Sequence, residues 1–279
     1  MVNIIEVKDL HYEYKDGTRA LKGLSFSVPQ GARVALLGPN GAGKSTLLLH
    51  LNGINMVQKG QVILMGRELG EKQGTWARSQ VGMVFQDPDD QVFSATVEED
   101  VAFGPVNMGL SRQEIQARVD ESLRAVGMAQ YREKAPYHLS YGQKKRVAIA
   151  GVLAMRPGII VLDEPMAYLD PRGKEDLLTI LEDLHRSGVT IIIATHDVDM
   201  AVEWADQVIL IKGGITLAQG DTSLLTNPEL VREAHLRLPI VTRIFRSFPG
   251  LYGGEIPCTV ARAVSIIQDL VEKKGFQIK

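Results

Sequence analysis

The sequence has few of the features that mark secreted or membrane-spanning proteins. Its single cysteine, Cys258, excludes an internal disulfide and fits a reducing compartment. No apolar run approaches the roughly 18 residues that a membrane-spanning helix requires. The opening residues, MVNIIEVKDL, carry charges at Glu6, Lys8 and Asp9 and lack the apolar centre of a signal peptide. We therefore expect the chain to reach a membrane only through a partner.

Neither sign of charge is in excess. Lysine and arginine total 31 and aspartate and glutamate total 33, which leaves a net charge of −2. A protein that binds nucleic acid through its charge is normally basic, so we expect no nucleic-acid partner. With 45% apolar and 23% charged residues, the 279-residue chain has ordinary globular composition and the size to fold without a disulfide or a metal.

Short aliphatic runs predict a largely parallel sheet. Near-continuous β-branched and aliphatic residues are typical of strands covered on both faces, and helical patterns alternate with them. The five runs are 34–37, 82–85, 159–162, 191–194 and 208–211. Earlier in the chain, a different pattern predicts three antiparallel strands. These lie at 4–7, 11–14 and 24–28.

A glycine-rich stretch follows the first aliphatic run and precedes a helix, and it matches the pattern GxxxxGK[ST]. Its glycines let successive N–H groups turn toward phosphate oxygens, and the helix N-terminus adds partial positive charge. Lys44 would reach the β- and γ-phosphates of ATP, and Ser45 would ligate Mg²⁺. The residues expected to bind ATP here are Gly38, Pro39, Asn40, Gly41, Ala42, Gly43, Lys44, Ser45 and Thr46.

The aliphatic run 159–162 ends in two carboxylates, Asp163 and Glu164. They are expected at the carboxyl edge of the sheet, where ligands bind in open α/β folds. Asp163 would hold Mg²⁺, and Glu164 would act as the general base that polarises the attacking water. Combined with the phosphate loop, the two acids predict hydrolysis of a nucleoside triphosphate.

Residues 138–143, HLSYGQ, lead into a helix and resemble the LSGGQ signature of ATP-binding cassette (ABC) ATPases. Ser140, Gly142 and Gln143 match the signature, whereas Tyr141 stands where glycine is usual. Ser140 with Gln143 is also a local capping box. The resemblance implies that Ser140, Gly142 and Gln143 face an ATP held by a second subunit. The fit of Tyr141 at that interface is open.

Four further residues occur in the order of the family motifs. The resemblance implies that Tyr14 stacks on adenine, with Tyr12 as the rival, and that Gln86 contacts Mg²⁺ and senses a membrane partner. It implies that His196 contacts the γ-phosphate as a catalytic residue. Asp170 would contact the partner subunit's ATP site and signal between the two sites, although a helix cap explains it equally well.

Six motifs in order over about residues 4–222 identify the chain as a member of the ABC ATPases. This implies an α/β P-loop NTPase fold, with a mostly parallel core sheet and an N-terminal antiparallel layer. The nucleotide-binding domain is expected at 1–224 and includes a helical signature subdomain at about 87–156. Residues 225–279 would form a small α+β subdomain that ends in a helix over about 259–274.

The chain has one phosphate loop and one signature, so the resemblance implies a second ATPase subunit, either identical or related. The C-terminal subdomain would aid dimerisation. Its final helix carries an apolar stripe that could serve this purpose or pack on its own domain. The stripe consists of Val260, Val264, Ile267 and Val271.

Residues 85–93 and 143–155 resemble the energy-coupling-factor (ECF) importers, most closely the cobalt type. This implies ATP-driven uptake of cobalt or nickel at the cytoplasmic face of the membrane, through a scaffold subunit and a substrate-binding membrane subunit. Asp87, Asp89 and Asp90 would form either a solvated loop or a groove rim that receives basic scaffold helices. The alternatives are the ATPase of a vitamin-type ECF importer or of another ABC transporter, and then a soluble ABC ATPase or a kinase or GTPase.

Overall fold

The computed structural model describes residues 2–249 and 256–274. Within them, one four-stranded antiparallel sheet has the order β2-β1-β4-β5. Its strands are β1 (Asn3–Glu13), β2 (Arg19–Pro29), β4 (Lys59–Leu64) and β5 (Arg67–Glu68). The two strands expected at 4–7 and 11–14 are a single strand, β1. The apparent break is an irregularity between Val7 and Leu10, where Asp9 has a φ of 46°.

The second sheet has six strands in the order β10-β9-β3-β8-β7-β6. They are β3 (Arg33–Leu37), β6 (Val81–Val84), β7 (Ile159–Asp163), β8 (Thr190–Thr195), β9 (Gln207–Lys212) and β10 (Ile215–Gly220). Strands β9, β3, β8, β7 and β6 are parallel, and β10 pairs antiparallel with β9. The five aliphatic runs are therefore confirmed as the parallel core.

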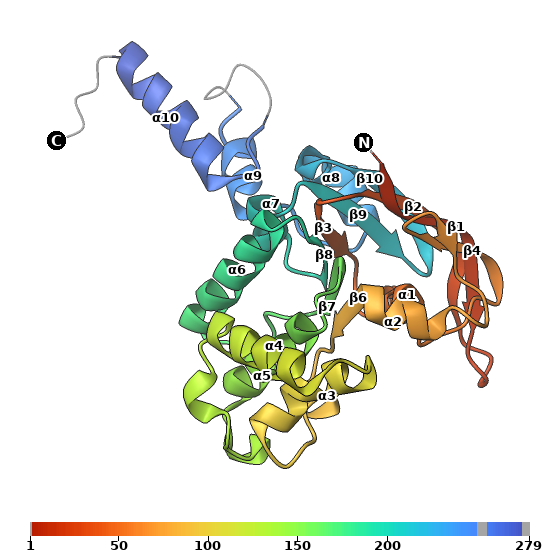
Figure 1. The fold of residues 1–279 in the computed structure, drawn as a ribbon. Helices are drawn as coiled ribbons and strands as arrows, with labels where there is room; N and C mark the ends of the chain where they lie inside the picture. Colours follow the sequence, from red (N-terminus) through yellow and green to blue (C-terminus); the bar gives the residue numbers. More distant parts are fainter. Residues whose placement is uncertain (1, 250–255, 275–279) are drawn as a thin grey trace.

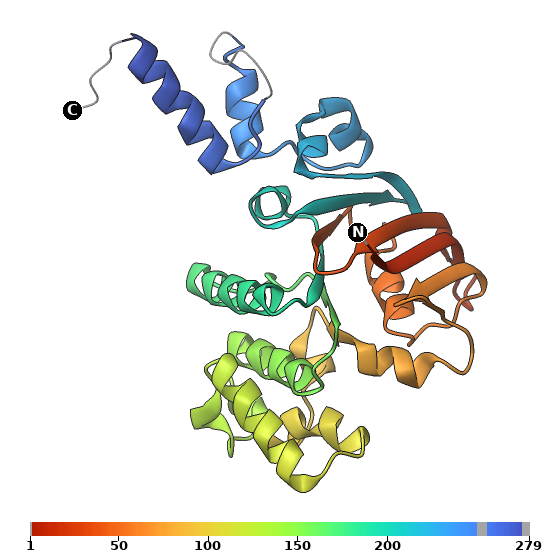
Figure 2. The ribbon, with the colours of Figure 1, turned by 45° about the horizontal axis from the view of Figure 1, so that its top comes forward.

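Side-chain alternation along β3 divides the hydrophobic core. Val34 and Leu36 pack with α1 (Lys44–Leu51) and the antiparallel sheet, whereas Ala35 and Leu37 pack with α7 (Val198–Trp204). A third cluster covers the other face of β7 with the helices that follow β6. These are α3 (Val97–Asn107), α4 (Arg112–Ala125), α5 (Tyr141–Ala154) and α6 (Pro171–Arg186). Figures 1 and 2 show α3, α4 and α5 grouped on the side away from β1 and β2.

Shorter elements complete these connections. They are α2 (Gly74–Gln80), η1 (Pro88–Asp90), η2 (Ala129–Tyr131), η3 (Pro136–His138) and η4 (Thr222–Thr226). Helix α4 begins after Ser111, whose Oγ accepts from Glu114 N at 3.3 Å. The Glu114 carboxylate does not complete a capping box, because it pairs with Arg118 at 2.7 Å.

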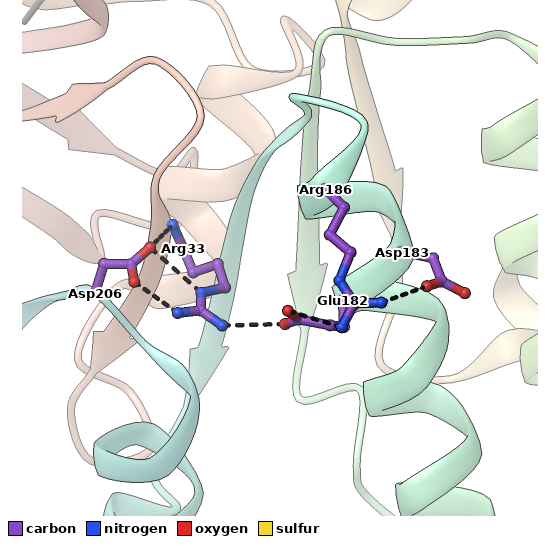
Figure 3. A network of polar contacts seen from close by, with 5 residues as sticks. All are labelled: Arg33, Glu182, Asp183, Arg186 and Asp206. Atoms are coloured by element: carbon purple, nitrogen blue, oxygen red, sulfur yellow. Dashed lines mark hydrogen bonds and ion pairs between the residues drawn. The ribbon is translucent and has the colours of Figure 1, made fainter.

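A polar network anchors α6 to the start of β3 (Figure 3). Arg33 donates to Asp206 Oδ1 at 2.7 Å, before β9, and to Glu182 Oε2 at 3.0 Å on α6. Arg186 extends the network along α6 with longer contacts to Glu182 and Asp183, at 3.6 and 3.4 Å. Burial raises the pKa of Asp206, but the hydrogen bonds and charge of Arg33 outweigh this and hold that pKa below its usual value.

The C-terminal segment differs from the expected α+β subdomain. Its described residues form α8 (Pro228–Glu233), α9 (Ile240–Arg246) and α10 (Val260–Lys274) and contain no strand. Prolines stand at the start of two of these helices, because Pro228 is the first residue of α8 and Pro239 caps α9. Helices α9 and α10 lie at the end of the molecule away from α3 to α5 (Figures 1 and 2).

The final helix begins close to its expected position, but most of its apolar stripe faces outward. Val260, Val264 and Ile267 are 56%, 46% and 48% exposed, so about half of each residue is accessible to solvent. The helix is attached at its start, where Val260 N donates to Glu203 of α7 at 2.6 Å. Within the described ranges, no helix has the length and apolar character needed to cross a membrane.

Candidate active site

The parallel sheet places the expected catalytic residues side by side. The phosphate loop follows β3, His196 follows β8, Asp163 ends β7, and Gln86 lies two residues beyond β6. These strands are adjacent in that order, and their ends are level because Leu37 pairs with Thr195 and Asp163 with Ala194. Four segments that are distant in the sequence therefore meet at the carboxyl edge of the sheet.

The phosphate loop has the backbone that its glycines predict. Gly41 and Gly43 have φ values of 76° and 102°, in the left-handed region. No side chain caps α1, which leaves its first N–H groups for a ligand. Lys44 is 6% exposed, and its Nζ donates to Gly38 O at 2.7 Å and to Pro39 O at 3.3 Å.

Glu164 lies at the centre of a cluster of hydrogen-bond donors. Its Oε1 is 3.5 Å from Lys44 Nζ and 2.9 Å from His196 Nδ1, and its Oε2 accepts from Thr195 Oγ1 at 3.1 Å. Glu164 has a φ of 42°, a strained conformation for a residue with a side chain that costs of order 1–3 kcal/mol. A hydrogen bond to the neighbouring strand β8 helps to hold this conformation, since Glu164 N donates to Ala194 O at 2.8 Å.

Asp163 and Ser45 provide the oxygen donors that Mg²⁺ prefers. Asp163 is 6% exposed. Burial raises its pKa, and the Glu164 charge adds to this, while a Ser45 hydrogen bond and the Lys44 charge lower it; the net shift is upward. Across the described ranges, no three His, Cys, Asp or Glu residues cluster as a metal site. This donor set fits an ion held mainly by the phosphates of a nucleotide, and such an ion would favour ionised Asp163.

Tyr14 and Tyr12 have different surroundings. Tyr12 packs against the core, with its ring 4.6 Å from the His50 ring. Tyr14 is 38% exposed, and its hydroxyl is 2.9 Å from Thr46 Oγ1 of α1. The Tyr14 side chain is thus tied to the phosphate-loop helix and remains accessible, whereas Tyr12 is engaged in packing.

Gln86 is exposed, and its backbone carbonyl is bound by the start of α5. Its carbonyl accepts from Tyr141 Oη at 2.9 Å and from Lys145 Nζ at 2.5 Å. Within the described residues, no hydrogen bond joins the Gln86 side chain to Ser45 or Asp163. Its contact with Mg²⁺ stays a prediction.

The signature residues lie around a separate cavity of about 520 Å³, between the first turns of α5 and α6. The residues expected to contact the partner subunit's ATP all line it: Ser140, Gly142, Gln143 and Asp170. No phosphate-loop residue does. Ser140 and Gln143 form a complete capping box, and Asp170 caps α6 by accepting from Gly173 N at 2.7 Å. The local capping interpretation of these residues is thus confirmed.

Two residues of the site could not be identified from the sequence pattern. Thr195 hydrogen-bonds Glu164, and its position directly before His196 is the only signal in the sequence. Lys145 is 1% exposed and holds the Gln86 carbonyl, although a lysine near the start of a helix is normally solvated. The sequence predicts the catalytic cluster, but not the contacts that orient it.

The fold and the site are those of an ABC-type P-loop ATPase. A family model described as ABC transporter matches residues 21–167. The chain is also similar to a dimeric, post-hydrolysis structure of an ATP-binding cassette bound to ADP and Pi. That likeness has a TM-score of 0.71 and 28% identity, and it covers 78% of this chain and 98% of the other.

Relatives define the type more closely. The chain is 49% identical, over 96% of its length and 98% of the relative's, to the energy-coupling factor transporter ATP-binding protein EcfA of Carboxydothermus hydrogenoformans. It is 52% identical to EcfA of Methanocaldococcus jannaschii, over 86% and 88% of the two chains. The structure of cbiO1 from Clostridium perfringens matches with a TM-score of 0.75 and 42% identity, covering 88% of this chain and 100% of that one. The chain belongs to the ABC transporter ATP-binding proteins, in the energy-coupling-factor type.

Proposed function

We propose that two ATPase chains form the working enzyme and that each ATP is bound between the phosphate loop of one chain and the signature of the other. The observation that carries this proposal is the separation of two clusters within one chain. Lys44, Glu164 and His196 are in mutual reach, whereas Ser140 and Asp170 line a different cavity. A second chain is needed to bring a signature to each catalytic cluster.

The catalytic cluster is arranged for in-line attack of water on the γ-phosphate. The phosphate-loop N–H groups and Lys44 bind the phosphates, Tyr14 stacks on adenine, and Glu164 accepts the proton of the water. Thr195 and His196 hold the Glu164 carboxylate, and His196 would contact the γ-phosphate. When bound by Ser45, Asp163 and the nucleotide, Mg²⁺ neutralises charge on the β- and γ-phosphates.

Lys44 connects binding to catalysis. Its ammonium contacts Glu164 at 3.5 Å and the phosphate-loop carbonyls at 2.7 and 3.3 Å. A γ-phosphate would compete with Glu164 for this ammonium, so ATP binding and the proposed base share one cation.

The solution mass of Glu164→Gln protein, with and without Mg-ATP, tests the proposed pairing. We expect the mass to double with Mg-ATP, because slow hydrolysis preserves the closed pair. Lys44→Met in the same background is the control and should stay monomeric. A mass that does not change with Mg-ATP in Glu164→Gln would contradict pairing of identical chains and favour a related second ATPase.

The proposed membrane scaffold has a suitable surface on the helical subdomain. Phe93 and Phe103 are 66% and 52% exposed and stack edge to face at 5.1 Å. The acidic residues after β6 lie close by in the chain, but they are not all free. Asp89 pairs with Lys144 at 2.5 Å, and Asp87 caps η1. This surface would receive scaffold helices through apolar contact with an acidic border, and would place the chain at the cytoplasmic face of the membrane.

The proposed cargo is cobalt or nickel, because residues 85–93 and 143–155 resemble the cobalt-type importers. The similar chain cbiO1 is described as part of the ABC transporter complex cbiONQ, with no cargo named. The competing cargo is a vitamin, as in the vitamin-type ECF importers. The relatives are described as energy-coupling factor transporter ATP-binding proteins, and this description specifies no cargo. Vesicles containing the co-expressed membrane subunits and this ATPase would distinguish these cargoes. ATP-dependent uptake of radioactive Co²⁺ or Ni²⁺, lost in Glu164→Gln, is the expected result; uptake of a vitamin alone would overturn it.

A further inference from the structure

Two side chains at the start of α5 hydrogen-bond the backbone just after β6, where the chain leaves the core sheet. Tyr141 Oη donates to Gln86 O at 2.9 Å, and Lys145 Nζ donates to the same oxygen at 2.5 Å. Lys145 also donates to Phe85 O at 3.2 Å. Tyr141 and Lys145 are four residues apart, so they project from the same helix face toward one carbonyl. Both lone pairs of that carbonyl are therefore used by α5.

Tyr141 also contacts the segment that follows Glu164. Its ring meets the Tyr168 ring edge to face, with centroids 5.4 Å apart. Tyr168 is 80% exposed and has a φ of 61°, in the left-handed region. The ring contact thus helps to hold a strained, otherwise solvated residue between Glu164 and Asp170. A glycine at position 141, usual in the signature, could make neither contact.

The surroundings of Tyr141 keep its hydroxyl protonated and donating. Burial, followed by the charge of Asp87 and further acidic neighbours, raises the pKa of Tyr141 to about 12. Burial lowers the pKa of Lys145 to about 8, so at neutral pH it is mainly an ammonium donor. The Lys145 ammonium lies 5.7 Å from the Tyr141 ring centre, within the range of a cation–π contact.

We propose that Tyr141 is a positioning residue that makes α5, the Gln86 backbone and the segment around Tyr168 move as one unit. The hydroxyl fixes Gln86, and the ring fixes Tyr168. Tyr141 touches no reacting atom and acts through Gln86 and the segment that carries Asp170. This inference rests on the proposed function, because it assigns Gln86 and Asp170 to the hydrolysis cycle.

Tyr141→Phe and Tyr141→Gly separate the two contacts, because phenylalanine loses only the hydroxyl. Hydrogen exchange of the purified chain is the first measurement. In Tyr141→Phe we expect faster exchange in residues 84–91 alone, and in Tyr141→Gly also in residues 165–170. Exchange in β3 and β8 should not change. Uniformly faster exchange, or no change at 84–91, would overturn the proposal.

Steady-state ATP hydrolysis is the second measurement. Losing one hydrogen bond should lower kcat of Tyr141→Phe by roughly three- to tenfold, with KM for ATP within about twofold, because Tyr14 and the phosphate loop are not affected. Tyr137→Phe is the matched control, since Tyr137 is 74% exposed and, among the residues that the structure describes, its ring stacks against His138 alone. If Tyr141→Phe matches wild type in kcat, the inference fails while the proposed function stands. If the wild-type chain alone does not hydrolyse ATP, the proposed pairing of identical chains fails.

Discussion

Glu164 Oε1 lies 2.9 Å from His196 Nδ1, although the two residues follow different strands and are 32 positions apart. The parallel pairing of β7 and β8 produces this contact, because it sets Asp163 beside Ala194. The proposed general base and the residue that orients it thus depend on strand register. A one-residue slip would move every side chain of the strand to the opposite face of the sheet.

Glu164→Gln should abolish most hydrolysis and retain ATP binding. The amide keeps the shape and hydrogen-bonding reach of the side chain but accepts no proton, so we expect a fall of about 10²-fold or more in turnover. Phosphate release measures the rate, and equilibrium binding measures affinity. Glu121→Gln is the control, since this exposed glutamate forms an ion pair with Arg156 on the surface, away from the site. A rate near wild type would rule out Glu164 as the base.

Lys44→Met should weaken ATP binding more than AMP binding. Lys44 is expected to contact the β- and γ-phosphates, and AMP has neither. Titration calorimetry with ATP, ADP and AMP measures the difference. Lys72→Met removes an exposed lysine outside the site and should leave all three affinities unchanged. Equal loss for ATP and AMP would point to a damaged fold instead of a lost phosphate contact.

Gly43→Ala and Gly41→Ala should differ, although both glycines have positive φ. A Cβ at Gly43 would lie 2.8 Å from Ala20 O and 2.9 Å from Leu21 Cδ2, whereas one at Gly41 meets nothing within 4 Å. Both variants carry left-handed strain of about 1–2 kcal/mol, but only Gly43→Ala adds a clash with backbone. Urea unfolding should show the larger loss for Gly43→Ala. Equal urea midpoints for the two variants would contradict the expected clash of a Cβ at position 43.

Arg33→Met should lower the free energy of unfolding by about 1–3 kcal/mol. We keep the expected loss in this range because the carboxylate partners of Arg33 are partly exposed to solvent. Asp206 has a depressed pKa in the folded state, so its contribution is full above its unfolded pKa and is lost as pH falls through the folded value. The difference in the free energy of unfolding between Arg33→Met and wild type should therefore become smaller below about pH 4. Urea unfolding at pH 7 and pH 3 tests this. Arg186→Met, at a 68% exposed arginine, should cost under about 1 kcal/mol.

Most residues at the carboxyl edge of the sheet could be predicted, because local sequence patterns indicate them. Aliphatic runs define buried strands, and polar residues after parallel strands must converge. The phosphate loop, Asp163 and Glu164 follow from this, whereas His196 was expected only from the resemblance to the ABC ATPases. The antiparallel layer was less accessible, since Lys8 and Asp9 interrupt the alternation of β1 at an irregularity that keeps the strand continuous.

Contacts between distant segments could not be predicted. Tyr141 reaches a backbone carbonyl 55 positions earlier, and backbone acceptors carry no residue identity. The C-terminal segment shows a similar limit. Its spaced prolines suit strand boundaries or helix starts equally well, and the structure uses Pro228 and Pro239 for helices. The outward orientation of Val260 and Val264 depends on what packs against α10, which helical periodicity alone does not specify.

The separation of the catalytic cluster from the signature cavity has a genetic consequence. Under the proposed pairing, a Lys44→Met chain still offers an intact signature, and a signature-defective chain still offers an intact Lys44. Cells that express both defective chains together would assemble one complete site per mixed pair. Two recessive alleles, each inactive alone, would then complement each other partially, whereas two alleles that alter the same cluster would not.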